Sequence, residues 1–562
     1  MAQTQYFVLA AQGKLIRLRI TVDGRNRLGM SELVHHFIHD AARRAPLAPA
    51  LVCGQRRFDY AALAGAVTTA ANALLATGIG RAERVAVYLD KRVETVAALF
   101  GAAAAGAAFV PVNPLLKPKQ VAHILGDCQV RVLVTSAARL RTLSPVLAAC
   151  DALHTIILTD PATATTTEAP AHCRVLGWEQ AMDAGAADGV APPHRVIDAD
   201  MAAILYTSGS TGLPKGVVLS HRNLVAGARS VAEYLALQPA DRILAVLPLS
   251  FDYGLSQLTT AFHAGATVVL MNYLFPRDIL KAVADEAITG LAAVPPLWME
   301  LAQLDWPRDC SLRFLTNSGG AMPVPTVRAL QAALPAARLF LMYGLTEAFR
   351  STYLPPEELE RRPESMGRAI PNAEIMVVRP DGSTCDVDEP GELVHRGALV
   401  ALGYWNDPAQ TAARFRPAPG RDPALVRPEI AVWSGDTVRR DADGFLYFVG
   451  RGDDMIKVSG YRISPTEIEE AAHATALVAE AVAFGVPHPQ LGQAVVLLAL
   501  AREPSLTVAE LTRQCQRLLP AYMAPAHVAL VDAAFPRNPN GKIDRVAVRL
   551  PFARLFEESA SR

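Results

Sequence analysis

The stretch Leu205-Tyr-Thr-Ser-Gly-Ser-Thr-Gly-Leu-Pro-Lys-Gly216 breaks an apolar run into hydroxyl groups and glycines and ends on one lysine. The apolar run, Met201–Tyr206, has the length and composition of a buried strand. A loop of this kind can wrap a phosphate, because Gly209 and Gly212 let backbone N–H groups approach the anion. The side chains that add hydrogen bonds or positive charge are Thr207, Ser208, Ser210, Thr211 and Lys215. We therefore predict a phosphate-binding loop at the end of a strand.

Two other interpretations of this stretch fit less well. A flexible Ser/Gly turn does not need four hydroxyl groups and a lysine within nine residues. The kinase-type phosphate loop has glycine before its lysine and Ser or Thr after it. Here Pro214 precedes Lys215 and Gly216 follows it, so that pattern fails.

On both sides of the loop, helical stretches alternate with short apolar runs, which is typical of doubly wound α/β layers. The predicted strands are Arg84–Tyr88, Phe109–Val112, Val130–Val134, Arg242–Leu247, Ala266–Met271, Gly290–Val294 and Arg338–Met342. Pro161–Pro170, rich in Thr, Ala and Pro, is predicted to be a surface loop.

After about residue 370 the pattern changes to closely spaced strands separated by Gly, Pro and Asp, which predicts a β-rich subdomain. Its strands are Glu374–Val378, Glu392–Arg396 and Gly444–Val449. A small α/β unit follows, with helices over Pro465–Ala474 and Val508–Leu519 and strands over Glu480–Val486, Ala494–Ala501 and His527–Val531. The fold class is therefore α/β, with a large N-terminal region and a small C-terminal domain.

The composition is that of a globular enzyme, with 51% hydrophobic and 19% charged residues. The 54 basic and 54 acidic side chains balance, so nothing indicates a nucleic-acid partner or an anionic membrane. Tyr6–Ala11 is too short for a signal-peptide core, and the alanine-rich Ala97–Val112 is a poor membrane span. The seven scattered cysteines lack metal-ligand spacing and predict a reduced, cytoplasmic protein without a structural metal.

The chain divides into four predicted parts. Residues 1–29 form an extension that we expect to be dispensable, because an amphipathic helix begins only after Ser31 and Met30 is a plausible natural start. Residues 30–452 form the large domain, 453–548 the small one and 549–562 a tail.

The phosphate loop resembles that of the adenylate-forming superfamily, which includes acyl-CoA synthetases, peptide-synthetase adenylation domains and beetle luciferases. The likeness covers residues about 31–545, with further segments in the order of the family. Within it, the chain is most similar to stand-alone AMP-forming acyl-CoA ligases associated with exosortase A systems. The resemblance implies ATP, Mg²⁺ and a thiol, either coenzyme A or the phosphopantetheine of a separate acyl carrier protein.

The resemblance also assigns nucleotide contacts. In Tyr343-Gly-Leu-Thr-Glu347 it implies that Tyr343 stacks on adenine, Thr346 bonds the α-phosphate and Glu347 holds Mg²⁺, with Gly344 in the turn. Ser318-Gly319-Gly320-Ala321 resembles the loop between adenine and the acyl pocket. Ser434-Gly-Asp436 and Gly450-Arg451 resemble the ribose and phosphate contacts, and Asp436 suits two hydroxyl donors.

A second group of residues is implied to act as the C-terminal domain turns between two half-reactions. Asp453 matches the hinge, and Lys457, Gly460 and Tyr461 match the face turned toward the thiol. Pro536–Arg545 matches the motif whose lysine, Lys542, meets the acid's carboxylate and the α-phosphate. Together with Thr207, Lys215 and Glu347, Lys542 completes the implied catalytic set.

The acid is left open. Phe251-Asp252 stands where amino-acid-activating members of the family pair an aspartate with the substrate's α-ammonium, whereas many acyl-CoA synthetases have histidine there. A buried carboxylate needs a cation, which favours an amino acid, but Asp252 could instead bond a backbone amide or Arg350.

The first hypothesis is an acyl-CoA ligase, and the alternative is a stand-alone amino-acid adenylating enzyme that loads a carrier in trans. The 20 residues after Lys542 cannot hold a carrier domain. An oxidising relative has no support in the sequence. An inactive relative would be expected to lack Lys215, Glu347 or Lys542, and all three are present.

Overall fold

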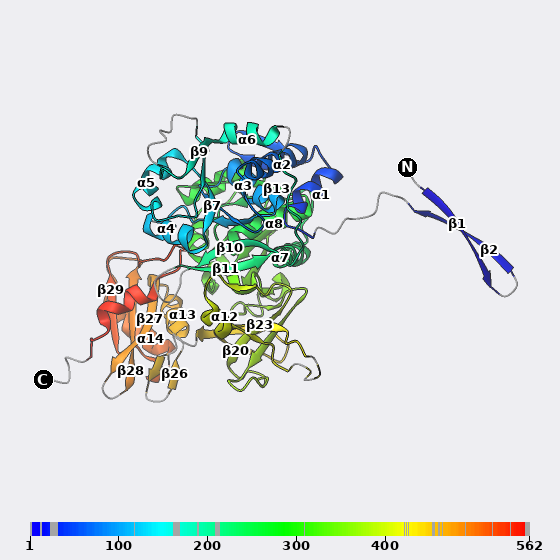
Figure 1. Ribbon diagram of the computed structural model, residues 1–562. Coiled ribbons are helices and arrows are strands. Elements are labelled where there is room, and N and C mark those ends of the chain that lie inside the picture. Colours follow the sequence, from blue (N-terminus) through cyan, green and yellow to red (C-terminus); the bar gives the residue numbers. More distant parts are fainter. Residues whose placement is uncertain are drawn as a thin grey trace.

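The computed structural model describes residues 32–556, except 117, 161–168, 188–189, 208–213, 308, 421, 423, 425, 452–455, 459–460, 464, 489–490, 520 and 540. It gives the backbone alone for residues 3–11, 14–22, 451, 457, 461–462, 467, 492 and 522. Two stacked sheets with their helices form the upper part of the molecule in Figure 1, and a β-rich part and the C-terminal part lie below them.

The first sheet carries the predicted phosphate loop. Its order is β21-β11-β10-β6-β5-β7-β8-β9, and the strands from β10 to β9 run parallel, while β11 and β21 are antiparallel additions at one edge. The bounds are Gly403–Tyr404 (β21), Lys215–Ser220 (β11), Met201–Thr207 (β10), Ala108–Pro111 (β6), Arg84–Tyr88 (β5), Val130–Thr135 (β7), Thr155–Leu158 (β8) and Arg174–Gly177 (β9). Parallel strands with both faces covered are apolar throughout, as these sequences are.

The second sheet has the order β18-β17-β16-β15-β14-β12-β13-β3-β4, with a parallel centre from β16 to β3. The bounds are Arg368–Ala369 (β18), Thr352–Leu354 (β17), Arg338–Tyr343 (β16), Phe314–Asn317 (β15), Gly290–Ala293 (β14), Arg242–Ala245 (β12), Thr267–Leu270 (β13), Pro49–Cys53 (β3) and Arg56–Asp59 (β4). Both sheets contribute side chains to one hydrophobic core.

Helices α3 (Val93–Ala105) and α8 (Asp252–Ala264) join the two layers inside this core. The Phe100 ring on α3 and the Phe262 ring on α8 meet edge to face at 5.5 Å between centroids. Helix α3 takes up much of the alanine-rich run that was predicted to be a poor membrane span, and nearly all of this helix is buried. The other helices of this part are His36–Arg44 (α1), Tyr60–Ala76 (α2), Pro118–Asp127 (α4), Ala137–Leu147 (α5), Trp178–Ala186 (α6), His221–Tyr234 (α7), Asp252–Ala264 (α8), Pro276–Asp285 (α9), Pro295–Leu301 (α10) and Val324–Ala333 (α11).

Two smaller sheets complete the chain. The β-rich part contains Ala373–Val378 (β19), Gly391–Gly397 (β20), Phe415–Pro417 (β22), Ile430–Arg440 (β23) and Leu446–Arg451 (β24), with helix Pro408–Arg414 (α12). The C-terminal part contains Ile456–Val458 (β25), Tyr461–Ile463 (β26), Val478–His488 (β27), Gly492–Ala501 (β28) and His527–Val531 (β29), with helices Pro465–Ala474 (α13), Val508–Leu518 (α14) and Arg545–Arg549 (α15). None of the described helices is both long enough and apolar enough to cross a membrane.

The predicted α/β architecture is confirmed, and most strand boundaries agree within two residues. The strand predicted from Gly444 begins instead at Leu446, because Gly444 has φ +85° and closes a turn by donating its N–H to the Asp441 carbonyl. The predicted loop Pro161–Pro170 falls largely outside the described residues.

The N-terminal extension contains a hairpin of Gln3–Ala11 (β1) and Lys14–Val22 (β2), whose strands pair with each other in a sheet of their own. In Figure 1 this hairpin stands apart from the rest of the chain. A two-stranded hairpin alone is marginally stable in water.

We expect that deleting residues 1–29 changes the melting temperature by less than about 2 °C, since the cores that hold the fold begin at Val34. Thermal unfolding of the full and shortened chains measures this. A large loss of stability would show that the hairpin packs on the body.

Candidate active site

The β10–β11 hairpin places Thr207 directly opposite Lys215, at the carboxyl end of the parallel strand β10. The loop that joins them, with Ser208, Gly209, Ser210, Thr211 and Gly212, lies outside the described residues. Among the described residues, the buried Thr207 hydroxyl has no hydrogen-bond partner. The two ends of the predicted phosphate loop are therefore held side by side. The Thr207 hydroxyl at one of these ends can bond a group that the described residues do not include.

Lys215 is held by a network that brings two distant motifs together. Its Nζ donates to the Tyr404 hydroxyl at 2.8 Å and lies 3.5 Å from Oε1 of Glu347. The Tyr404 hydroxyl in turn donates to Oε1 of Glu347 at 2.5 Å. The ammonium also lies 4.1 Å from the centre of the Tyr404 ring. The lysine of the phosphate loop and the proposed metal ligand thus share one hydroxyl group.

The ionisation of Glu347 follows from this network. Burial would raise the pKa of its carboxyl group, but the Lys215 charge and the Tyr404 hydrogen bond outweigh burial and hold the pKa below the ordinary value of 4.5. Glu347 therefore carries a negative charge at neutral pH although it is only 7% exposed.

A second pair joins the predicted adenine and ribose contacts. The Tyr343 hydroxyl donates to a carboxylate oxygen of Asp436. Gly435 has φ +68°, a left-handed backbone conformation that favours glycine in the turn before Asp436. The backbone of Arg451 pairs with that of Asp436 across β23 and β24, while the Arg451 side chain lies outside the described residues.

The loop after β15 contains the residues predicted to lie between adenine and the acyl pocket. Ser318 is buried, and Gly319, Gly320 and Ala321 are exposed. Gly319 has φ +88°, which turns the chain sharply after the strand. Gly344, at the end of β16, lies against the backbone of Arg350. These positions fit a border between a nucleotide and a second pocket.

Asp252 is already paired with a cation of the chain itself. Its carboxylate accepts from Nη1 of Arg350 at 2.8 Å and from the Thr346 hydroxyl at 3.3 Å. It also begins helix α8, where the helix dipole favours a negative charge, and Phe251 caps that helix and packs on the core. Asp252 therefore needs no cation from the substrate, because Arg350 supplies one.

The turn that carries Lys542 lies at the sheet edge where Thr207 stands, at the carboxyl ends of β6 and β10. The Asn113 side chain donates to the Pro539 carbonyl at 2.9 Å, and Asn113 follows strand β6. Because β6 and β10 are parallel neighbours, their carboxyl ends meet at one edge, and Thr207 stands at the end of β10. Asp453 and Gly460 and the side chains of Lys457 and Tyr461 lie outside the described residues.

Tyr404 and Asn113 contact predicted site segments, and neither of them was predicted from the sequence. Tyr404 lies in a Gly-Tyr-Trp segment for which the sequence predicted no strand. The pairing of β21 with β11 brings it to Lys215. Arg350 was considered only as one possible partner of Asp252.

Glu347 fits the role of a magnesium ligand in chemical type. Magnesium binds through one or two carboxylates together with substrate phosphates and water, so it needs no protein cage. Accordingly, no cluster of three His, Cys, Asp or Glu side chains placed for a metal occurs within the described part of the chain.

Comparison with known proteins agrees with this geometry. A family model described as AMP-binding enzyme matches residues 38–405, and one described as AMP-binding enzyme C-terminal domain matches residues 467–542. The L-proline–[L-prolyl-carrier protein] ligase of Pseudomonas fluorescens is 34% identical, over 92% of this chain and 99% of the relative.

Two further relatives are named for other acids. The 3-hydroxybenzoate–CoA ligase of an Aromatoleum species is 30% identical, over 89% of this chain and 93% of the relative. The solved structure of O-succinylbenzoate coenzyme A synthetase from Bacillus subtilis, in complex with ATP and magnesium, is 25% identical with a TM-score of 0.76. It covers 91% of this chain and 99% of the solved chain.

Lys215→Met should make the protein more sensitive to acid. A depressed carboxyl pKa contributes stability that is present above the unfolded-state pKa and is lost as the pH falls through the folded-state pKa. Because Lys215 is the main group that lowers the pKa of Glu347, its removal raises that pKa and moves the loss of stability to higher pH. Urea unfolding measured from about pH 3 to pH 7 tests this. The exposed Lys281→Met is the control, and identical profiles for both variants would contradict the prediction.

Asp252→Ala should destabilise the fold by about 3–5 kcal/mol, because it leaves the Arg350 guanidinium buried beside no carboxylate. Asp198→Ala is the matched control, since Asp198 pairs with Arg222 at 2.7 Å on the surface and should cost no more than about 1 kcal/mol. Chemical denaturation of both variants gives the comparison. Equal losses would mean that burial of the Asp252 pair has no energetic consequence.

Proposed function

Because this chain belongs to the AMP-binding enzyme family and is an adenylate-forming ligase, we propose that it activates a small carboxylic acid with ATP and transfers the acyl group to a thiol. The observation that carries the proposal is the buried network of Lys215, Tyr404 and Glu347 at the carboxyl end of β10. It fixes one cation and one anion where a triphosphate and its metal would need them.

In the first half-reaction an oxygen of the acid's carboxylate attacks the α-phosphorus of ATP. The new O–P bond forms the acyl-adenylate, and the bond between the α-phosphorus and the bridging oxygen breaks to release pyrophosphate. Two anions must approach each other, so cations have to offset their repulsion. Lys215 is proposed to neutralise phosphate charge, Thr207 and Thr346 to donate hydrogen bonds, and Lys542 to hold the carboxylate against the α-phosphate. Glu347 would hold magnesium, which would further neutralise the phosphate charge.

The nucleotide is proposed to lie between the two sets of contacts that the fold brings together. Tyr343 would stack on adenine, and Asp436 would exchange its Tyr343 hydrogen bond for bonds from the ribose hydroxyls. The loop of Ser318, Gly319, Gly320 and Ala321 would separate adenine from the acyl pocket. Gly344 and Arg451 complete the proposed nucleotide contacts.

In the second half-reaction the thiol sulfur attacks the acyl carbon of the adenylate, a C–S bond forms, the C–O bond to AMP breaks and the thiol proton is released. We propose that the C-terminal domain, residues 453–548, turns about Asp453 between the two steps. The gap between the two family matches, from 405 to 467, contains this position. Lys457, Gly460 and Tyr461 would then face the thiol.

The proposed acceptor is coenzyme A, as in the hydroxybenzoate and succinylbenzoate relatives by name. The second candidate is a carrier protein loaded in trans with an amino acid. It is favoured by the prolyl-carrier relative, which this chain matches over nearly its full length. Acid-dependent exchange of labelled pyrophosphate into ATP, over a panel of acids and amino acids, tests the first step. Thioester formation with coenzyme A and with a phosphopantetheinylated carrier then separates the two acceptors.

Lys542→Ala should reduce pyrophosphate exchange by at least about 10²-fold while leaving thioester formation from supplied acyl-adenylate within a few-fold of the parent. The reason is that Lys542 lies on the C-terminal part and is proposed to meet the carboxylate in one orientation only. Arg549→Ala, which removes another exposed cation of the same part, is the control. Equal loss of both half-reactions would assign Lys542 a structural role.

A further inference from the structure

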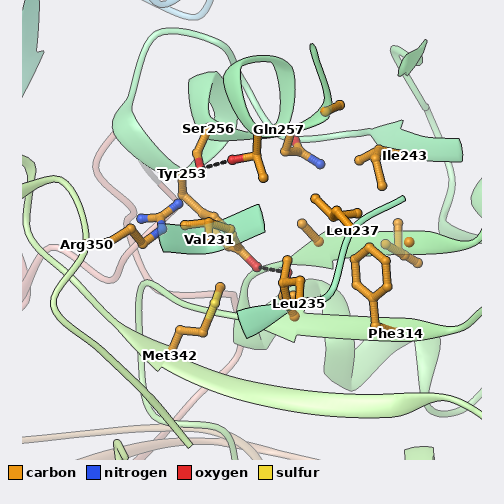
Figure 2. Close-up of a pocket in the computed structure, with 16 residues that line it drawn as sticks. Val231, Leu235, Leu237, Ile243, Tyr253, Ser256, Gln257, Phe314, Met342 and Arg350 are labelled. Carbon is orange, nitrogen blue, oxygen red and sulfur yellow. Dashed lines mark hydrogen bonds between the residues drawn. The ribbon is translucent and has the colours of Figure 1, made fainter. Parts of the chain in front are cut away.

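A pocket lined mainly by apolar side chains lies between helices α7 and α8 and the second sheet, and Arg350 stands at one end of it (Figure 2). It holds about 400 Å³ of empty space, part of which is open to solvent. Apolar side chains that line it include Val231, Leu235, Leu237, Ile243, Phe314 and Met342. A guanidinium in such surroundings has to be offset by specific partners.

Arg350 has a partner for only part of its guanidinium. Nη1 donates to Asp252 at 2.8 Å and to the Phe349 carbonyl at 3.1 Å. Nε and Nη2 are buried and have no acceptor among the described residues, although Arg350 is only 1% exposed. These two groups form one edge of the guanidinium, on which two parallel N–H bonds can point at one ligand. Buried donors of this kind destabilise a protein when they have no partner.

The backbone is strained in order to place this side chain. Phe349 has φ +54° and ψ −44°, and Arg350 donates its N–H to the Ala348 carbonyl at 2.6 Å, which closes a tight γ-turn. The Phe349 ring fits only because residue 227 is glycine, since a Cβ there would lie 2.5 Å from the ring. The Arg350 guanidinium then stacks on the Tyr253 ring, 4.7 Å from its centre. The fold therefore fixes Arg350 before any ligand arrives.

Arg350 links the pocket to the proposed reaction site, because it lines the pocket and also pairs with Asp252. Arg350 contacts Asp252, and Asp252 accepts from Thr346, the neighbour of Glu347. An acid whose carboxylate lies at Thr346 would extend its acyl group past Arg350 into the pocket. We infer that Arg350 selects the acid, and this inference rests on the proposed function. The selected acid has an acyl group with an oxygen that accepts hydrogen bonds from the Nε–Nη2 edge of Arg350.

An α-ammonium group fits this position less well than an oxygen. An ammonium brought to Asp252 would lie beside the Arg350 cation that already neutralises this carboxylate. An oxygen acceptor adds no positive charge and satisfies donors that are otherwise buried without partners. Gln257 adds a buried acceptor, because its Nε2 donates to the Leu244 carbonyl and its Oε1 has no donor among the described residues. A substrate hydroxyl could serve both kinds of group.

The test compares acyl-sulfamoyl adenosines, stable mimics of the acyl-adenylate, by isothermal calorimetry. The acyl groups are butanoyl, 2-hydroxybutanoyl, 3-hydroxybutanoyl, 3-carboxypropanoyl and 2-aminobutanoyl. We expect at least one oxygen-bearing probe to bind at least tenfold tighter than the butanoyl probe, and Arg350→Lys to remove most of that advantage. Preference for the carboxyl probe would identify a diacid, and preference for a hydroxyl probe a hydroxy acid.

Arg222→Lys, at an exposed ion pair, is the matched control. If Arg350→Lys fails to fold, the double variant Arg350→Met/Asp252→Asn removes both charges together and should abolish the same preference. Tightest binding of the 2-aminobutanoyl probe, equal binding of all probes, or a preference that survives both Arg350 variants would overturn the inference. Binding of none of the probes would instead overturn the adenylation proposal on which it rests.

Discussion

The buried charge of Glu347 is the constraint on which the site depends. A carboxylate in this position is tolerated because the Tyr404 hydroxyl donates to it and Lys215 lies 3.5 Å away. These three residues come from three separate segments, so the contact holds the β10–β11 hairpin, the turn after β16 and the short strand β21 in one arrangement. Lys215 is thereby held in place beside the predicted phosphate loop, which would avoid an entropic cost if it acts in the proposed reaction.

A second buried pair, Asp252 with Arg350, lies where the acyl group is proposed to bind. It differs from the first because its cation keeps two donors without partners among the described residues. A pair that served stability alone would be expected to satisfy every donor, since orphaned buried N–H groups are costly. The strained turn at Phe349 supports the same view, because strain of this kind persists where the surrounding packing and a function require it.

The fold class could be predicted from local sequence, whereas the phosphate loop stays a prediction. Apolar runs such as Arg84–Tyr88 and Val130–Val134 became strands with nearly the same boundaries, because a parallel strand covered on both faces must be apolar. The start at Leu446 was missed because a glycine with positive φ ends a turn rather than beginning a strand. The association with exosortase A systems and the domain boundaries remain predictions.

By itself, the sequence determined the alternation of strands and helices, the hydroxyl-rich loop and the order of the motifs, since these depend on neighbours in the chain. Only the tertiary structure decided that Tyr404 links Lys215 to Glu347, and that Asp252 is neutralised from within by Arg350 rather than left for a substrate cation. The physical reason is that the charge state and partners of a buried group depend on which segments the sheets bring together. Contacts between residues that lie dozens of positions or more apart in the chain leave no periodic signal in the sequence.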